Sequence, residues 1–323
     1  MKRREFVGAL GTGVAAGLLP GPMRASLLPA YRGRDTAFAA HRHFIERWSW
    51  AMGQPVHLQL FATSSDHGYA AAAAALAELR RVEHKLSRFD DTSDLSELNR
   101  RAGQRGSRVG DDLRKVLAHS LHFERLTQGG FDPAIEPLMR AWGFRTPRAS
   151  EPTPAELEQA RKAVLAARVT ISDESVCLTG SDTCLDLGGI GVGYGLDRAM
   201  ATLREAGIRS AFLDVSGDCM AIGSPPGQDG WLVDIAGPRP GDPRVASLRL
   251  CDAALATSTN KKSVVQYGRV ARGHVINPDS GWPADALVQV SVVARTAIEA
   301  DALSTAMLVS GRPVPGVLRY YKA

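Results

Sequence analysis

Segments with the apolar spacing of a helix and segments with that of a strand follow one another in this chain without a regular alternation. Residues 56–61 alternate between apolar and polar side chains, which is typical of a half-buried strand. Residues 70–89 instead carry apolar side chains at steps of three and four, from Leu76 to Phe89, as an amphipathic helix does. A doubly wound sheet needs a repeating strand–helix unit, so the irregular order favours an α+β fold with mixed or antiparallel sheets and flanking helices.

The remaining elements are short and are separated by turns rich in Gly, Pro and Asp. We expect further helices over 112–128, 154–167, 193–206 and 299–309. We expect further strands over 169–171, 176–178, 183–187, 211–215, 220–222, 231–235, 247–250 and 288–293. Thr153 is the expected N-cap of the second of these helices, and residues 31–48 are expected to be a polar lead-in. The chain has neither an internal repeat nor a long linker, which predicts one main domain over 45–320.

The composition is that of a globular protein, because 44% of the 323 residues are hydrophobic and 23% are charged. Lys and Arg number 39 against 34 Asp and Glu, which leaves a net charge of +5. The basic residues are scattered and form no stripe interleaved with aromatic residues, which argues against nucleic acid as a partner. A mildly positive chain is compatible with an anionic substrate.

The first 30 residues have the layout of an export signal. Lys2-Arg3-Arg4 is followed by an apolar run over 8–19 and then by Pro20-Gly21-Pro22. The run is shorter than the roughly 20 apolar residues that span a bilayer, so the sequence does not predict a transmembrane protein. The adjacent arginines resemble a twin-arginine signal, with Lys2 where Ser or Thr is preferred, and they predict a periplasmic protein. An ordinary basic terminus is the alternative.

The cysteines Cys177, Cys184, Cys219 and Cys251 form no C-x-x-C motif, and no histidine pair at zinc spacing accompanies them. A two-residue turn at Gly180-Ser181 would place Cys177 opposite Cys184, where an exported protein could oxidise the pair. The residues favour the alternative, in which both cysteines are small buried hydrophobic residues.

Two segments carry groups suited to phosphate and metal binding. Asp186-Leu-Gly-Gly-Ile-Gly-Val-Gly-Tyr-Gly-Leu-Asp197 places glycines between a strand and a helix, where free backbone N–H groups can bind an anion, although a tight turn is the simpler explanation. In Glu299-Ala-Asp301-Ala-Leu-Ser-Thr305 the carboxylate of Asp301 and the hydroxyl of Thr305 share one helix face, which suits Mg²⁺. Taken alone, these acidic residues are better explained by the dipole at a helix N-terminus.

Two further segments combine polar and aromatic groups. Ala256-Thr-Ser-Thr-Asn-Lys-Lys262 and Arg272-Gly-His274 bring hydroxyls, two lysines and a histidine, which a phosphoryl-transfer site can use, although a lone histidine is more often structural. Residues 129–144 are dense in turn formers and aromatic residues, and they suit either a planar ligand or an ordinary capped loop.

Taken together and in this order, the segments resemble the ApbE family of FAD:protein FMN transferases. The matching elements are Met52-Gly53, Ser87 to Asn99, Phe131-Asp-Pro133 with Trp142-Gly-Phe144, Asp186-Leu-Gly-Gly-Ile190 with Gly193-Tyr194 and Asp197, His274-Val-Ile-Asn-Pro278 with Gly281, and Ala300-Asp-Ala-Leu-Ser-Thr-Ala306. They cover about 50–312, and six elements in register are far more specific than any one alone. The resemblance implies a T-fold-related architecture.

The resemblance also implies an activity: transfer of FMN from FAD to a Ser or Thr hydroxyl of a target flavoprotein, with release of AMP. It implies Mg²⁺ held by Asp301, Thr305 and the backbone carbonyl of Gly191, and His274 as the acceptor of the hydroxyl proton. Phe89 is expected to stack on the flavin ring. The residues expected to bind FAD are Met52, Phe89, Asp132, Asp186, Gly188, Gly189, Gly193 and Lys261.

The chain departs from the family pattern around the expected diphosphate. Val192 stands where the family usually has Lys, which removes a cation, although Lys261 or Lys262 could reach the same place. Ser216-Gly217 replaces the usual Gly-Gly, and Ser258-Thr-Asn260 replaces the usual Ser-Gly-Asp. These departures are compatible with a slow enzyme, an altered donor, or a member that binds flavin without transferring it.

The leading prediction is a periplasmic, Mg²⁺-dependent FMN transferase that acts on an exported domain of a membrane electron-transfer protein. Its signal resembles that of members linked to nitrous oxide reduction. Two alternatives remain at this point. One is an exported FAD-binding assembly factor with little or no transferase activity, which Val192 supports. The other is an FAD pyrophosphatase, in which water replaces the target hydroxyl.

Overall fold

The computed structural model describes residues 43–172, 175–314, 317 and 319–322. The predicted export signal over 1–30 lies outside these described residues. The compact unit that contains all of the described elements begins at residue 41. Among the helices in the described part of the chain, none is both long enough and apolar enough to cross a membrane.

A seven-stranded sheet with the order β1-β2-β5-β6-β9-β12-β13 forms the centre of this unit, and every neighbouring pair is antiparallel. The strands are β1 (His43–Ala51), β2 (Gln54–Ala62), β5 (Ser210–Val215), β6 (Asp218–Ile222), β9 (Ala254–Thr259), β12 (Gln289–Ala294) and β13 (Arg319–Lys322). Met52 and Gly53 connect β1 to β2, and both have positive φ, 56° and 68°. This is the backbone of a two-residue hairpin turn whose twist matches that of the strands.

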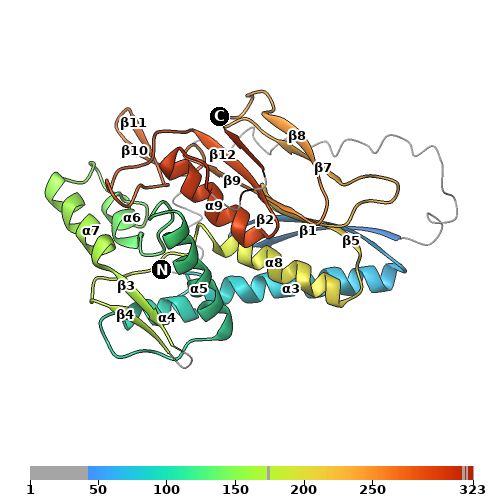
Figure 1. The fold of residues 1–323 in the computed structure, drawn as a ribbon, viewed down its shortest axis with the longest axis horizontal. Helices are drawn as coiled ribbons and strands as arrows, with labels where there is room; N and C mark the ends of the chain where they lie inside the picture. Colours follow the sequence, from blue (N-terminus) through green and yellow to red (C-terminus); the bar gives the residue numbers. More distant parts are fainter. Residues whose placement is uncertain (1–42, 173–174, 315–316, 318, 323) are drawn as a thin grey trace. The chain divides into compact units, whose positions relative to one another are not determined.

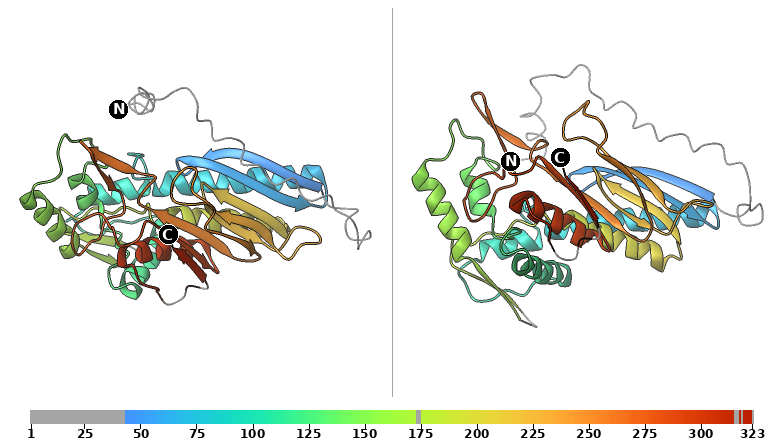
Figure 2. Two further views of the ribbon diagram at one scale, coloured as in Figure 1. Left: turned by 90° about the horizontal axis from the view of Figure 1, so that it is seen from above. Right: turned by 45° about the horizontal axis from the view of Figure 1, so that its top comes forward.

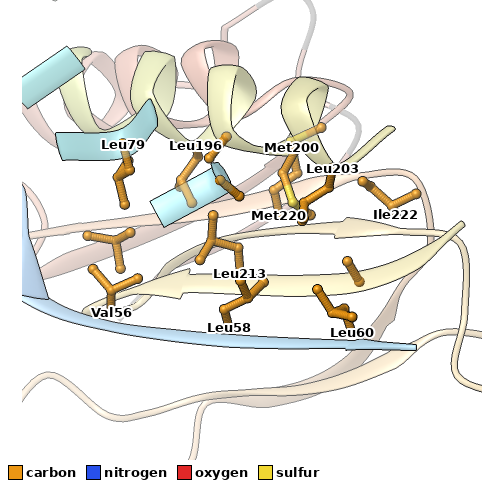
Figure 3. Close-up of a cluster of buried hydrophobic side chains, with 14 of the residues drawn as sticks. Val56, Leu58, Leu60, Leu79, Leu196, Met200, Leu203, Leu213, Met220 and Ile222 are labelled. Atoms are coloured by element: carbon orange, nitrogen blue, oxygen red, sulfur yellow. The ribbon is translucent and has the colours of Figure 1, made fainter. Parts of the chain in front are cut away.

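Three helices cover one face of the sheet: α3 (Ser65–Leu86), α8 (Gly191–Glu205) and α9 (Ala297–Ser310) (Figure 1). The core lies between them and the strands, where Leu79 of α3 and Leu196 of α8 lie over Leu58 and Leu213 (Figure 3). These side chains are buried because strands that alternate and helices with a stripe at steps of three and four each present one apolar face.

A hairpin of β7 (Trp231–Ile235) and β8 (Ala246–Leu250) packs against part of the other face. Trp231 is stacked with Phe212 and tilted against Phe61. Because helices cover one face of β9 and the hairpin covers the other, the strand is apolar on both sides. Ala256 belongs to the core under the helices, and Leu255 belongs to the core under the hairpin.

The remaining elements group at one end of the sheet (Figures 1 and 2). They are α4 (Asp94–Arg100), α5 (Asp111–Leu126), α6 (Glu136–Ala141), α7 (Pro154–Ala166), and the hairpins β3 (Arg168–Ile171) with β4 (Val176–Thr179) and β10 (Val264–Tyr267) with β11 (Val270–Gly273). Trp142 is fully buried here, and its indole N–H donates to the carbonyl of Gly281, which joins the loop after α6 to the loop after β11.

The structure confirms the predicted α+β class and the predicted cap of α7, where Thr153 and Glu156 form a capping box. Two expectations are wrong. Residues 183–187 form no strand, because the side chain of Asn99 bonds both the N–H and the carbonyl of Leu185, and these groups are then not available to a ladder. Part of the expected polar lead-in is strand β1, whose outer face leaves Trp48 and Trp50 exposed.

The four cysteines are all free in the structure. Cys177 lies in β4, opposite Thr170 rather than opposite Cys184. Cys184 follows the turn outside any strand, and its sulfur accepts a hydrogen bond from Arg140 at 3.2 Å. The two cysteines are therefore not paired with each other, and Cys184 is buried as the alternative expects, whereas Cys177 is only half-buried.

Candidate functional site

A cavity of about 460 Å³ lies beside the start of α8, the middle of α9 and the end of β9. Its wall is built from segments that are far apart in the sequence. They include Phe89, Gly130 to Asp132, Arg145, Asp186, Gly188, Gly189, Val192, Ser216, Asp218, Thr257 to Thr259, Lys262, Ser263, His274 to Ile276, Asp301 and Thr305. Most of the segments singled out in the sequence therefore meet at one place.

Asp301 belongs to α9, a helix that is apolar around most of its circumference and is buried as a result. The Asp301 side chain is only 5% exposed, and its Oδ2 accepts a hydrogen bond from the N–H of Gly193 at 2.9 Å. A Cβ atom on Gly193 would lie 2.3 Å from the carbonyl oxygen of Ala297. The glycine therefore lets α8 approach α9 closely enough for its N–H to hold the carboxylate.

A second carboxylate, the half-buried Asp218 at the start of β6, lines the same cavity, and Thr257 donates its N–H to Asp218 Oδ1 at 2.9 Å. Burial raises the pKa of Asp218 to about 6. Burial, and next the charge of Asp218, raise the pKa of Asp301 well above its ordinary value. The two carboxylates are thus close enough to repel each other. Sequence reasoning missed Asp218, although it directly follows Ser216-Gly217, which had been noted only as a departure.

Hydroxyl groups surround the two carboxylates. Thr305 lies one helical turn after Asp301, and its Oγ1 is 3.2 Å from the hydroxyl oxygen of Ser258. Ser258 is also within 2.8 Å of the hydroxyl oxygen of Ser304. A Cβ on Gly189 would lie 3.1 Å from Thr305 Oγ1, so the glycine-rich loop passes directly over this hydroxyl.

The donor set fits a hard divalent cation such as Mg²⁺. Two carboxylates whose charges are poorly compensated, together with hydroxyl oxygens, are ligands that Mg²⁺ accepts while it keeps several waters or substrate oxygens. Within the described residues no group of three or more His, Cys, Asp or Glu is placed to hold a metal, so the hydroxyl oxygens, water and the substrate would have to complete the ligand set. The predicted ligands Asp301 and Thr305 both line the cavity, whereas Gly191 is buried at the start of α8 and does not.

Arginines and carboxylates form a network at another part of the wall, where Arg145 and Asp186 line the cavity. Glu136 is 0% exposed, and it pairs with Arg88 at 2.5 Å and with Arg145 at 2.8 Å. Arg145 also pairs with Asp186. Both guanidinium groups lie over the ring of Phe89, at 5.1 and 5.5 Å from its centroid. That ring is nevertheless 75% exposed, and a planar ligand can therefore reach it.

His274 follows β11 and lines the cavity, with its ring edge-on to Phe144 at 6.5 Å. Its Nδ1 is buried and has no hydrogen-bond partner among the residues that the structure describes. Burial lowers the pKa of the imidazole below its ordinary value, so His274 is neutral at pH 7. A neutral imidazole can accept a proton.

The other residues predicted to bind FAD divide into two groups. Asp132, Asp186, Gly188 and Gly189 line the cavity. Burial raises the pKa of Asp132 to about 6, although its Oδ1 accepts the N–H of Ala134. Met52, Gly193 and Lys261 do not line it: Met52 packs against the main core, Gly193 acts through Asp301, and Lys262 is on the wall instead of its neighbour Lys261.

The chain matches the model of the ApbE family over residues 52–318. It is 30% identical over 273 residues to a FAD:protein FMN transferase of Treponema pallidum, covering 76% of this chain and 75% of that relative. It is 26% identical over 245 residues to a FAD:protein FMN transferase of Haemophilus influenzae, covering 73% and 71%. The crystal structure of an ApbE protein from Thermotoga maritima is similar with a TM-score of 0.76 and 28% identity, over 83% of this chain and 87% of that one. The resemblance seen in the sequence is confirmed, and this chain belongs to the ApbE family.

Proposed function

We propose that this protein is a FAD:protein FMN transferase, which moves the FMN part of FAD to a Ser or Thr hydroxyl of a target flavoprotein and releases AMP. One observation carries the proposal: a single cavity joins a pair of carboxyl groups, a neutral imidazole and an exposed aromatic ring. The similar proteins of Treponema pallidum and Haemophilus influenzae bear the name of this activity.

The reaction exchanges a phosphoanhydride bond of FAD for a phosphoester bond to the target hydroxyl. The oxygen of the target hydroxyl attacks the phosphorus of the FMN phosphate, and the bond from that phosphorus to the oxygen shared with AMP breaks. His274, neutral at pH 7, accepts the proton of the hydroxyl. Phe89 offers an exposed ring on which the flavin stacks.

Charge neutralisation is the second requirement of phosphoryl transfer. Asp301 and Thr305, with Asp218 beside them, would hold Mg²⁺, whereas Gly191, the third predicted ligand, does not line the cavity. When bound, the metal would neutralise the diphosphate and the charge that develops on the leaving AMP. Gly193 keeps the Asp301 carboxylate in place through its N–H.

The proposal extends to place and partner. The basic residues Lys2-Arg3-Arg4 before an apolar run support export to the periplasm by a twin-arginine route. The target is then an exported domain, and we propose that it belongs to a membrane electron-transfer protein. Such a domain needs to present one Ser or Thr in an accessible loop, because the acceptor oxygen has to enter the cavity.

The decisive experiment incubates the mature protein with FAD, Mg²⁺ and an acceptor domain, and follows the acceptor by intact mass. We expect the acceptor to gain the mass of one FMN. We expect the gain to be lost in Asp301→Ala and kept in Asp229→Ala, a matched control at an exposed loop position.

Two other outcomes would contradict the transferase. Tight FAD binding with no mass gain would leave the flavin-binding assembly factor. Release of AMP together with free FMN, in the absence of any acceptor, would leave the FAD pyrophosphatase.

A further inference from the structure

We propose that Lys262 contacts the diphosphate of FAD and supplies the cation that Val192 does not. This inference rests on the proposed function only in that FAD is the ligand. Lys262, in the loop between β9 and β10, and Val192, in the first turn of α8, both line the cavity. The positive charge therefore reaches the ligand from a different element than the family pattern leads one to expect.

Only two permanent cations line the cavity among the described residues, Arg145 and Lys262. Arg145 is already paired with two carboxylates, those of Glu136 and Asp186. Lys262 makes no ion pair with any residue that the structure describes, and its Nζ donates to the carbonyl of Ser216 at 3.2 Å. Its charge is therefore available to an anionic ligand, whereas that of Arg145 is largely neutralised.

Lys262 also lies at the part of the cavity that holds the carboxylates Asp218 and Asp301. A Cβ on Gly217 would lie 3.8 Å from Lys262 Nζ, and Gly217 immediately precedes Asp218. A carboxylate at the half-buried Asp218 repels a diphosphate, so a cation beside it offsets that repulsion.

The loop places Lys262, and not Lys261, on the wall. Thr259 donates its hydroxyl to the carbonyl of Val288 and accepts the N–H of Lys261. Asn260 donates its amide to the carbonyl of Ala284 and accepts the N–H of Val275. Because the two residues before the lysines are fixed on both sides, the direction in which the chain leaves them is fixed as well.

The proposal is tested by binding rather than by turnover, with EDTA present so that no metal contributes. Affinities are measured by titration calorimetry for FAD, for ADP, which carries the diphosphate without the flavin, and for riboflavin, which carries the ring without phosphate. We expect Lys262→Met to weaken FAD and ADP about tenfold, the effect of one charge-assisted hydrogen bond, and to leave riboflavin unchanged. Lys115→Met, at an exposed position of α5, is the matched control and should change none of the three.

A second variant tests the relation to Val192. In Lys262→Met, the further change Val192→Lys should restore most of the lost affinity for ADP, because residue 192 lines the same cavity. Unchanged ADP affinity in Lys262→Met would overturn the proposal, and so would an equal loss for ADP and riboflavin. If Lys261→Met lost ADP affinity and Lys262→Met did not, Lys261 would make the contact and the proposal would be wrong.

These measurements separate the two proposals. If Lys262 governs ADP affinity but no acceptor gains FMN in the mass experiment, the transferase fails and the diphosphate contact stands. If FMN is transferred and Lys262→Met binds ADP as the unmodified protein does, the transferase stands and the diphosphate contact fails. Lys262 is exposed, so its replacement should leave the thermal unfolding midpoint unchanged, and this serves as the check on folding.

Discussion

At the scale of single residues, the site depends on positions that accept only one type of residue. Gly193 is the clearest case, because its missing side chain allows α8 to lie against the backbone of α9 at Ala297. Its N–H then reaches Asp301. Gly193 therefore serves both the packing of the two helices and the placement of a functional carboxylate.

Replacing Gly193 with Ala should destabilise the protein strongly. The new Cβ would lie 2.3 Å from a backbone oxygen, which cannot move aside as a flexible side chain can. We expect the free energy of unfolding to fall by at least about 1–3 kcal/mol, as for overpacked cores. Urea unfolding measures this, and Gly191→Ala in the same helix is the control, since nothing lies within 4 Å of its Cβ. An equal effect in both variants would contradict the explanation.

Sequence spacing predicted some of these residues and not others. Asp301 and Thr305 lie one helical turn apart, which is a local relation, but the resemblance to the family was needed to assign them to a metal. Asp218 was missed because its place opposite Asp301 depends on the pairing of β6 with β9, which brings distant segments together. Lys261 was predicted to bind FAD, whereas Lys262 lines the cavity, because the choice depends on the contacts of Thr259 and Asn260.

At the scale of elements, α9 is held at its N-terminus by two devices. Thr296 and Glu299 form a capping box within the helix. Asp197 of α8 accepts the N–H groups of Ala297 and Ile298 at 2.8 and 3.0 Å. Burial nevertheless raises the pKa of Asp197 to about 6, because it outweighs the two hydrogen bonds.

The stability of the protein should therefore depend on pH through Asp197. A carboxyl whose pKa is raised on folding adds stability that is complete below its unfolded pKa of 3.8 and lost as pH rises through about 6. The difference corresponds to about 3 kcal/mol. We expect the free energy of unfolding to fall less steeply between pH 4 and 6 in Asp197→Asn than in the unmodified protein. Parallel curves from urea unfolding at each pH would show that Asp197 does not titrate in this range.

Element boundaries followed the sequence where periodicity was local and failed where tertiary contacts decided. The helices α3, α7 and α9 were anticipated within a few residues, because each carries its own apolar pattern or cap. Strand β1 was not anticipated, because an edge strand with exposed Trp48 and Trp50 has no clear apolar alternation. The stretch around Leu185 was misassigned because a distant side chain, Asn99, satisfies its backbone.

At the scale of the whole molecule, the cavity brings together the buried carboxyl group of Asp301 and the half-buried one of Asp218 from distant parts of the chain. Ionising both carboxyl groups is unfavourable in the folded protein, because burial and their mutual repulsion raise the pKa of Asp301 well above its ordinary value. A divalent cation that binds between them relieves this repulsion only in the folded state.

Mg²⁺ should consequently raise the thermal unfolding midpoint at pH 7.5, and EDTA should reverse the effect. At a concentration one hundred times the dissociation constant, binding adds about 2.7 kcal/mol, which for a domain of this size corresponds to a rise of several degrees. Asp301→Ala should abolish the rise. Scanning calorimetry measures the midpoint. If Mg²⁺ raised the midpoint of Asp301→Ala by the same amount, the cation would bind elsewhere.

The network of Arg88, Glu136, Arg145 and Asp186 has a thermodynamic consequence for ligand binding. Each of these side chains is already held by partners within the protein, so the wall beside Phe89 is preorganised. When a flavin binds there, few protein side chains lose rotamer freedom. Little of the contact energy is therefore lost to ordering the protein. Selectivity at this wall then comes from shape, since a ring that does not match a rigid surface finds no second arrangement to fit.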